Sequence, residues 1–278
     1  IDVINSYNEI DIKKYNFYSG LKLQRDYDLV IANAWQTAEC CYLQKHKCKK
    51  IVYIIQDLEY LFYPDNIKLQ NNVKETYKKE FNYYCLSKYL YNHFKNMNFE
   101  SVFDSVLSFN SNDYFNKKNN RENRICIAYY KNKENRLPQL VESIILKLYT
   151  NYKLYIFPDN FDKIKNKNII NLSILTKKQL NELYNKCKIG IVFSNSNPSR
   201  LGIEMKASGL NVIEYLSEFT KYDLSDLHFN KIKNTSNILH LVNKLLVKKS
   251  EYKLEKDFFK KFNNIVERNK FLDFISRL

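Results

Sequence analysis

The chain has 278 residues, of which 45% are hydrophobic, and this is enough for one large domain or two small ones around an ordinary core. No apolar run approaches the roughly 20 residues that a membrane-spanning helix needs, which argues against such a span. The formal net charge of +15 leaves three kinds of partner open: nucleic acid, an anionic membrane surface, or a phosphorylated ligand.

The basic residues are spread over the whole chain. The composition is rich in Lys, Asn, Ile and Tyr and poor in Gly and Pro. An AT-rich genome gives this composition to a soluble protein as well. Solubility therefore explains the charge as well as a phosphate-bearing partner does. No block joins clustered Lys or Arg to exposed aromatic residues, as nucleic-acid binding would require, so no nucleic-acid partner is expected.

The cysteines and the first residues indicate the compartment. None of the six cysteines forms a C-x-x-C pair, which predicts free thiols in a reducing cytosol. The group around Cys40 and His46 fits no zinc-ligand spacing, so no metal site is expected. The N-terminal residues alternate charged and apolar side chains, unlike a signal peptide. We expect a cytoplasmic protein, with peripheral contact at the anionic inner face of a membrane left open.

In the first half of the chain, short β-rich runs alternate with helical patterns, which predicts an α/β fold with a parallel sheet. Strands are predicted at residues 27–33, 50–56, 82–86 and 103–109, and helices at 35–46, 73–80 and 88–96. Within 50–56, the residues IVYII form a continuous apolar run, as is typical of a strand buried on both faces. These are few strands for a complete domain and the chain begins with Ile1, so we expect this half to be incomplete.

Residues 110–124 contain almost no apolar side chains and form the best linker, after which a second alternating series begins. Strands are predicted at 124–129, 153–157, 168–171, 189–193 and 211–214, and helices at 136–149, 176–186, 200–208, 235–246 and 254–278. Thr176 and Gln179 form a capping box at the start of one of these helices. We therefore predict two Rossmann-like domains, residues 1–116 and 117–255, followed by a terminal helix at 256–278.

Three of the four glycines, at positions 190, 202 and 209, fall within residues 188–215 (KIGIVFSNSNPSRLGIEMKASGLNVIEY). This stretch predicts a buried strand, a polar loop, a helix opened by Pro198 and Ser199, and another strand. The free N–H groups of such a helix start point into the crevice at the carboxyl end of a parallel sheet, where a diphosphate binds well. One turn into the helix, Glu204 is placed to accept hydrogen bonds from ribose hydroxyls. The plain alternative is a helix that Ser199 caps and Gly209 ends.

The segment NPSRLGIEMKASGLNVIE at 197–214 resembles the nucleotide-sugar-binding signature of family 4 glycosyltransferases, and more closely that of the WsaF-type rhamnosyltransferases. Further similar pieces occur in the same order: NAWQTA at 33–38, IIQDLEYLFYP at 54–64, ETY at 75–77 and AYYKNKENR at 128–136. The resemblance implies the GT-B fold, in which two Rossmann-like domains face a cleft and the terminal helix packs back on the first. It also implies a retaining transfer, with the nucleotide-sugar as substrate and no cofactor.

The resemblance implies donor contacts residue by residue. The donor-binding set is Asn197, Pro198, Ser199, Arg200, Leu201, Glu204 and Leu175. In it, residues 197–199 meet the diphosphate, Glu204 holds the ribose, and the loop 172–175 lies against the base. The catalytic set adds Lys131 and Arg136, which neutralise the diphosphate as the sugar leaves. Two departures weaken the match: Ser196 stands where many members have a second acid, and Lys131 replaces an arginine and loses its bidentate fork.

The loop QDLEYLFYP at 56–64 resembles a segment of the same transferases and implies acceptor binding, with its aromatic rings stacking on sugars. The predicted acceptor residues are Trp35, Gln56, Asp57, Glu59 and Tyr60. The alternative is a loop whose aromatic side chains fill the domain core and whose acids are solvated.

The chemistry that follows is sugar transfer by charge stabilisation. Fixed cations and helix N–H groups stabilise the charge that develops on the leaving phosphate, and no D-x-D pair is placed to hold a metal. The predicted enzyme moves a sugar, by resemblance rhamnose from dTDP, to a saccharide or lipid-linked saccharide in surface polysaccharide assembly. The alternative is an inactive nucleotide- or sugar-binding module derived from such a transferase.

Overall fold

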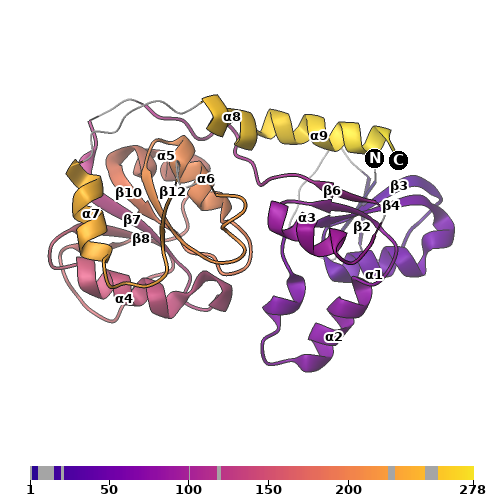
Figure 1. Ribbon diagram of the computed structural model, residues 1–278, viewed down its shortest axis with the longest axis horizontal. Helices are drawn as coiled ribbons and strands as arrows, with labels where there is room; N and C mark the ends of the chain where they lie inside the picture. The colour runs from indigo at the N-terminus through magenta and orange to yellow at the C-terminus, as the bar shows by residue number, and fades with distance from the viewer. Residues whose placement is uncertain are drawn as a thin grey trace. The chain divides into compact units, whose positions relative to one another are not determined.

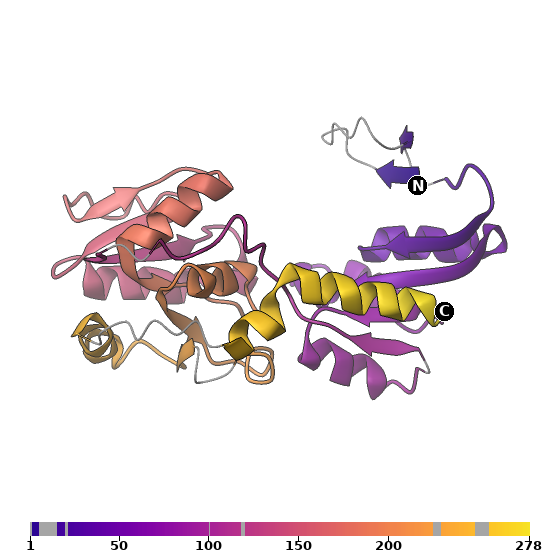
Figure 2. The same ribbon diagram turned by 90° about the horizontal axis from the view of Figure 1, so that it is seen from above.

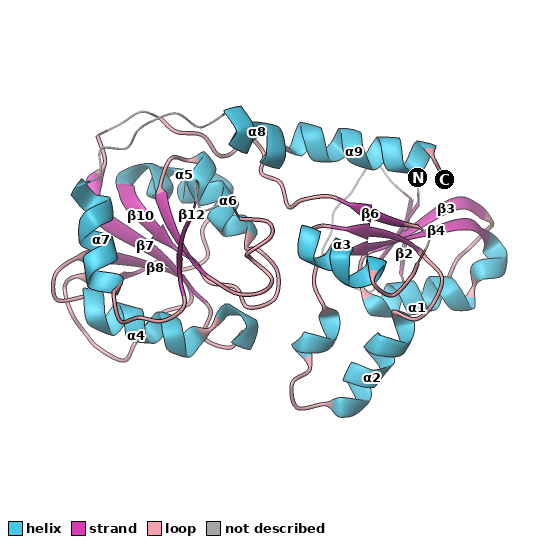
Figure 3. Ribbon diagram, viewed as in Figure 1, coloured by secondary structure: helices cyan, strands magenta, loops and turns pink. Residues whose placement is uncertain are grey.

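The computed structural model describes residues 2–5, 16–19, 22–99, 101–117, 120–224, 229–247 and 256–278. The chain divides into two compact units (Figure 1). The first comprises residues 1–86, 90–104 and 278, and the second comprises residues 87–89 and 105–277. Each unit has a main parallel sheet with helices packed around it (Figure 3).

The first unit is built on a four-stranded parallel sheet in the order β3-β4-β5-β6. Its strands are β3 (Tyr27–Ala32), β4 (Cys48–Ile55), β5 (Asn82–Cys85) and β6 (Val102–Asp104). Its helices are α1 (Trp35–Leu43), α2 (Ile67–Thr76) and α3 (Lys88–Lys95), the last beginning in the second unit, with 3₁₀ turns η1 (Lys45–Lys47) and η2 (Glu59–Phe62). Two further strands, β1 (Asp2–Asn5) and β2 (Asn16–Ser19), pair in parallel with each other.

The second unit holds a six-stranded parallel sheet in the order β12-β11-β10-β7-β8-β9. Its strands are β7 (Glu122–Tyr129), β8 (Lys153–Pro158), β9 (Ile169–Asn171), β10 (Cys187–Ile191), β11 (Asn211–Tyr215) and β12 (Phe229–Ile232). Its helices are α4 (Pro138–Leu148), α5 (Lys177–Lys186), α6 (Arg200–Ala207), α7 (Ile238–Val247), α8 (Lys256–Phe262) and α9 (Asn264–Ser276), and η3 (Glu134–Arg136) precedes α4.

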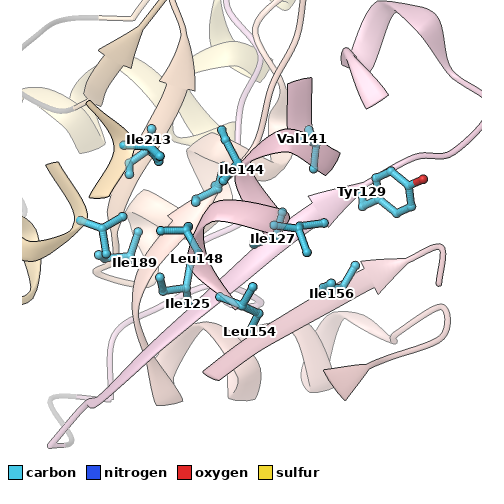
Figure 4. Close-up of a cluster of buried hydrophobic side chains, with 14 of the residues drawn as sticks. Ile125, Ile127, Tyr129, Val141, Ile144, Leu148, Leu154, Ile156, Ile189 and Ile213 are labelled. Carbon is cyan, nitrogen blue, oxygen red and sulfur yellow. The ribbon is translucent and has the colours of Figure 1, made fainter. Parts of the chain in front are cut away.

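Helices cover both faces of this second sheet (Figures 1 and 2). Alternate residues of β7, Ile125 and Ile127, pack with Ile144 of α4 in one buried cluster (Figure 4). Val242 of α7 belongs to the same cluster. On the opposite face, β10 approaches α6 so closely that a Cβ at Gly190 would lie 2.5 Å from the sulfur of Met205. Because both faces are covered, the inner stretches of the central strands are apolar, at residues 125–129 of β7 and 189–191 of β10.

The predicted boundary at residue 116 differs from the observed division at residues 104 and 105. The segment 105–117, which we call the connecting segment, is bonded to the second unit. Asn185 of α5 accepts a hydrogen bond from the N–H of Lys117 at 2.8 Å and donates one to the carbonyl of Phe115 at 2.9 Å. A polar sequence predicts a loop here correctly, but it does not show which unit the loop bonds to.

The terminal helix predicted at 254–278 is two helices, α8 and α9, in the described residues from 256 on. The break falls at Asn263, whose extended backbone ends α8 and whose side chain caps α9 by accepting from the N–H of Ile265 at 2.8 Å. Phe109 of the connecting segment hydrogen-bonds on both sides of this break, to Phe262 and Asn264. The prediction that this region packs on the first unit stays a prediction.

Candidate functional site

The order of the second sheet reverses between β7 and β10, because β8 and β9 lie on one side of this pair and β11 and β12 on the other. In open α/β sheets, ligands bind outside the carboxyl ends of the strands at such a switch point. The segment that follows β7 is residues 130–136, and the one that follows β10 is residues 192–199. These are the two segments whose sequences predicted contact with a diphosphate.

Hydrogen bonds join these two segments. The N–H of Asn195 donates to the carbonyl of Asn135 at 2.8 Å, and the Asn135 amide donates to the Ser196 hydroxyl at 3.3 Å. Arg136 is the next residue and therefore lies near the loop that leads into α6. The structure thus places a cation and a helix N-terminus at one edge of one sheet.

The N-terminus of α6 is not closed by a side-chain cap. Ser199 is the residue before the helix, but its hydroxyl accepts no capping hydrogen bond, so the plain cap that was the alternative reading is not formed. Gly209 does end the helix as predicted, with φ of +92° and hydrogen bonds back to Lys206 and Met205. The first N–H groups of α6 therefore keep their capacity to bind an anion.

Most of the predicted diphosphate residues are buried beneath this edge. Asn197 and Ser199 are each 5% exposed and Pro198 is also buried, whereas Arg200 is exposed and Leu201 is half-buried. A buried, hydrogen-bonded loop presents its backbone in a fixed geometry, which suits recognition through N–H groups.

Glu204 is buried on α6, with 7% of its surface exposed. Burial raises the pKa of Glu204 to about 7, against the charge of Arg200 and a hydrogen bond from Tyr114. Lys177, at the start of α5, lowers that pKa and Asp113 raises it, and these two form an ion pair of 3.2 Å. Glu204 therefore faces a mixed polar environment, and its burial favours the protonated form more than in an exposed glutamate.

The loop predicted to lie against the base ends beside the groups that surround Glu204. Leu175 is half-buried and directly precedes the capping box of Thr176 and Gln179, which the structure confirms. Because Lys177 is within electrostatic reach of Glu204, the loop 172–175 lies close to this carboxylate.

Arg136 and Glu204 are brought together around Tyr130. Burial raises the pKa of Tyr130, Arg136 lowers it, and Glu204 raises it further, so both charges lie close to this phenol. The Nη1 atom of Arg136 is buried and has no hydrogen-bond partner among the described residues. An arginine with an unused donor at a switch point is well placed to meet an anionic ligand.

Lys131, the other predicted cation, lies elsewhere. Its side chain is exposed, and its backbone N–H donates to Asp159 at 2.8 Å. Burial raises the pKa of Glu142, but Lys163, and more weakly Lys131, lower it overall. No interaction described for the second unit joins Lys131 to Glu204 or Arg136. Of the two predicted cations, Arg136 therefore lies near Glu204 and Lys131 does not.

Glu214 is a buried acid that the sequence analysis did not select. Its Oε1 accepts from the N–H groups of Ser194 and Tyr215, each at 3.0 Å, which holds the start of the loop before α6. Burial raises its pKa to about 8, although those N–H groups and Arg136 lower it. The sequence shows only an acid after the apolar residues Val212 and Ile213, and this does not reveal which groups the acid meets in the fold.

The predicted acceptor residues lie in the first unit, where Trp35 and Glu59 belong to a closed hydrogen-bonded group. The Glu59 carboxylate accepts from the Tyr53 hydroxyl and from the N–H of Trp35 at 2.8 Å. Burial raises the pKa of Glu59 against these two hydrogen bonds. Trp35 also donates from Nε1 to the Tyr63 hydroxyl at 3.0 Å. These contacts join the N-terminus of α1 to β4 and η2.

The neighbouring acceptor residues differ in exposure. Gln56 is exposed and Tyr60 is half-buried, with Lys74 over its ring at 5.0 Å from the centroid. Asp57 is buried and accepts from the N–H of Leu58 at 2.8 Å. Gln56 and Tyr60 therefore have side-chain surface that a ligand can contact, whereas Asp57 and Glu59 mainly hold the local structure.

Two hollows flank the second sheet. One of about 440 Å³ lies at the switch-point edge and is lined by residues 195, 215–219, 221 and 233. The other, of about 460 Å³, is lined by residues between Phe161 and Asn171, and neither hollow is lined by a predicted site residue. Among the described residues, no helix is long and apolar enough to cross a bilayer, and no group of His, Cys, Asp or Glu side chains is arranged to hold a metal ion.

The sequence matches no protein-family model and no curated protein. The fold does match solved structures. Sucrose-phosphate synthase from Thermosynechococcus elongatus aligns with a TM-score of 0.73 at 8% identity, over 90% of this chain and 73% of that one. Anabaena HepE, solved with UDP and glucose, aligns with a TM-score of 0.73 at 10% identity, over 91% and 78%. TarM aligns with a TM-score of 0.68 at 14% identity, over 88% and 54%.

These neighbours are GT-B glycosyltransferases, and the chain has their α/β fold with parallel sheets. The predicted fold class is confirmed. At these identities the likeness establishes the fold, and the activity rests on the site.

Proposed function

We propose that the chain is a glycosyltransferase whose second unit binds a nucleoside-diphosphate sugar. The observation that carries the proposal is the switch-point edge, where the uncapped N-terminus of α6, Arg136 and Glu204 come together. The titles of two neighbouring HepE structures record UDP with glucose and UDP-glucose, which supports this class of donor.

The proposed roles follow from charge. The leaving diphosphate accepts hydrogen bonds from the N–H groups around residues 197–201 and the charge of Arg136, and both stabilise the negative charge of the transition state. Glu204 accepts from the ribose hydroxyls, and the loop ending at Leu175 contacts the base. Lys131 is exposed and would serve as a second cation when its side chain turns toward the phosphate.

The finer parts of the proposal rest on the resemblance. They are a deoxyhexose donor such as dTDP-rhamnose, retention at the anomeric carbon, metal independence, and a saccharide or lipid-linked acceptor in surface polysaccharide assembly. A cytoplasmic location with peripheral membrane contact belongs with them. For the acceptor we propose the loop of Gln56 and Tyr60, which keep exposed surface, with Trp35, Asp57 and Glu59 holding its shape.

Thermal unfolding with UDP, dTDP and GDP and their sugars tests the donor class. A ligand at 100 times its Kd stabilises the folded protein by about 2.7 kcal/mol, so one nucleotide should raise Tm clearly above the others. Release of nucleoside diphosphate with an acceptor present then separates the transferase from an inactive binding module. A Tm unchanged by all three nucleotides at millimolar concentration would contradict the proposal.

A further inference from the structure

The connecting segment is fixed to the part of the second unit that carries Glu204. Besides the two hydrogen bonds to Asn185, the N–H of Phe115 donates to the Asn181 side chain at 3.3 Å. That same Asn181 oxygen accepts from the Ser208 hydroxyl, the C-terminal cap of α6, at 3.0 Å. The segment and α6 therefore share one buried asparagine, which is 4% exposed.

Tyr114 projects from this segment into the interior beside Glu204. It is 4% exposed, and its ring stacks on Tyr184 of α5 with centroids 6.2 Å apart and planes at 30°. The Glu204 carboxylate lies within reach of its hydroxyl, and a side-chain hydrogen bond from Tyr114 lowers the pKa of Glu204. The ring stacking fixes the direction of the phenol, so the hydroxyl has a defined position against the carboxylate.

We propose that Tyr114 is a positioning residue of the donor site, whose hydroxyl orients the Glu204 carboxylate toward the ribose. This rests on the proposed function. It makes the connecting segment part of the donor site, although its polar sequence reads as a linker.

The role follows from what a buried carboxylate needs. A carboxylate in apolar surroundings rotates or takes up a proton unless hydrogen bonds hold it. Arg200 on α6 and Lys177 on α5 contribute charge, Asp113 opposes them, and Tyr130 also lies within reach. Of the neighbours whose effect on this carboxylate is described, Tyr114 supplies a directed hydrogen bond.

The Tyr114 hydrogen bond lowers the pKa of Glu204, so its removal raises that pKa. The ionised carboxylate accepts the stronger hydrogen bonds from ribose, because charge-assisted bonds are stronger than neutral ones. Without the hydroxyl, the protein should therefore need a higher pH to bind a nucleotide with the same affinity.

The experiment compares Tyr114→Phe with Tyr184→Phe, each titrated with UDP, dTDP and GDP from pH 5.5 to 8.5. Both changes remove one buried phenol oxygen, but the Tyr184 hydroxyl has no hydrogen-bond partner among the described residues and is the matched control. For the nucleotide that binds wild type, we expect Tyr114→Phe to raise Kd roughly tenfold at pH 7. We expect the midpoint of its pH dependence to move up, while Tyr184→Phe behaves as wild type.

A carboxyl-carbon NMR titration of Glu204 without ligand gives a second, independent readout, with a higher pKa expected in Tyr114→Phe. Unchanged affinity and unchanged pKa in that variant would overturn the positioning role, as would equal losses in both variants, since these would indicate packing alone. If Tyr114→Phe shifts the pKa of Glu204 but the protein binds none of the nucleotides, the proposed donor-binding function is wrong and the interaction of Tyr114 with Glu204 still holds.

Discussion

Glu59 of the first unit and Glu204 of the second are both buried acids, 8% and 7% exposed, and burial raises the pKa of each. They differ in how their oxygens are used. Each oxygen of Glu59 has a protein partner, Tyr53 or the N–H of Trp35, within one structural unit. Glu204 faces a hydroxyl and two cations beside an uncapped helix N-terminus. A raised pKa therefore does not by itself mark a functional site. The hydrogen-bond partners of the carboxylate oxygens show whether the acid serves the fold or is placed to bind a ligand.

The largest expected effect is on activity, from Glu204→Ala. Loss of a charged acceptor for the ribose should lower transfer about 100-fold, because hydrogen bonds to charged groups contribute about 1.5–3 kcal/mol. The fold should persist, since removing a buried carboxylate of raised pKa also removes its desolvation cost. Transfer kinetics and circular dichroism check this, and full activity in the variant would count against the site.

The same transfer assay should show different losses of activity for the two predicted cations, Arg136 and Lys131. Arg136→Ala should lower kcat about 100-fold, as expected for a group that stabilises transition-state charge, whereas Lys131→Ala should cost less than about tenfold. The reason is that Arg136 has an unused buried donor near Glu204, while Lys131 is exposed. Equal losses in the two variants would show that Lys131 turns into the site when the donor binds.

Glu59→Ala should act on stability. It leaves the Tyr53 hydroxyl and the N–H of Trp35 without their acceptor, which should lower the free energy of unfolding by about 2–3 kcal/mol. Nucleotide affinity of the folded fraction should not change. Urea denaturation and nucleotide titration check the two parts, and a stable variant with lost acceptor affinity would instead make Glu59 a binding residue.

The smallest effect concerns pH and Glu214. Its folded pKa of about 8 lies above the ordinary value of 4.5, so the folded state holds the extra proton and stability falls as pH rises toward and past 8. From pH 6.5 to 9 the loss should be about 2 kcal/mol, by the linkage between pKa and stability. Glu214→Gln should flatten the profile, which thermal unfolding at several pH values measures. An unchanged slope would show that Glu214 is ionised throughout.

Local patterns predicted most of the elements. The apolar run of β4 and the capping box of α5 depend on neighbours in sequence, and both were predicted correctly. The strand β12 and the break at Asn263 were not predicted, because each depends on pairing with a distant segment, β11 and Phe109 respectively.

In the site, too, the sequence predicted the residues that belong to local motifs and missed those that depend on distant partners. The start of α6, Glu204 and Arg136 could be selected because their motif is local or resembles known transferases. Tyr114 and Glu214 could not, since an isolated tyrosine in a polar segment and an acid in a strand gain meaning only from folded partners. The exposed position of Lys131 was likewise invisible in the sequence.

Calorimetric titration of wild type, Glu204→Gln and Glu59→Gln with the nucleotide that stabilises the protein most tests the central claim directly. Both substitutions keep the size of the side chain and remove one buried charge. We predict that Glu204→Gln loses most of the affinity and that Glu59→Gln keeps it. Wild-type affinity in Glu204→Gln would mean that this carboxylate does not hold the ribose, and the donor site would have to be sought elsewhere.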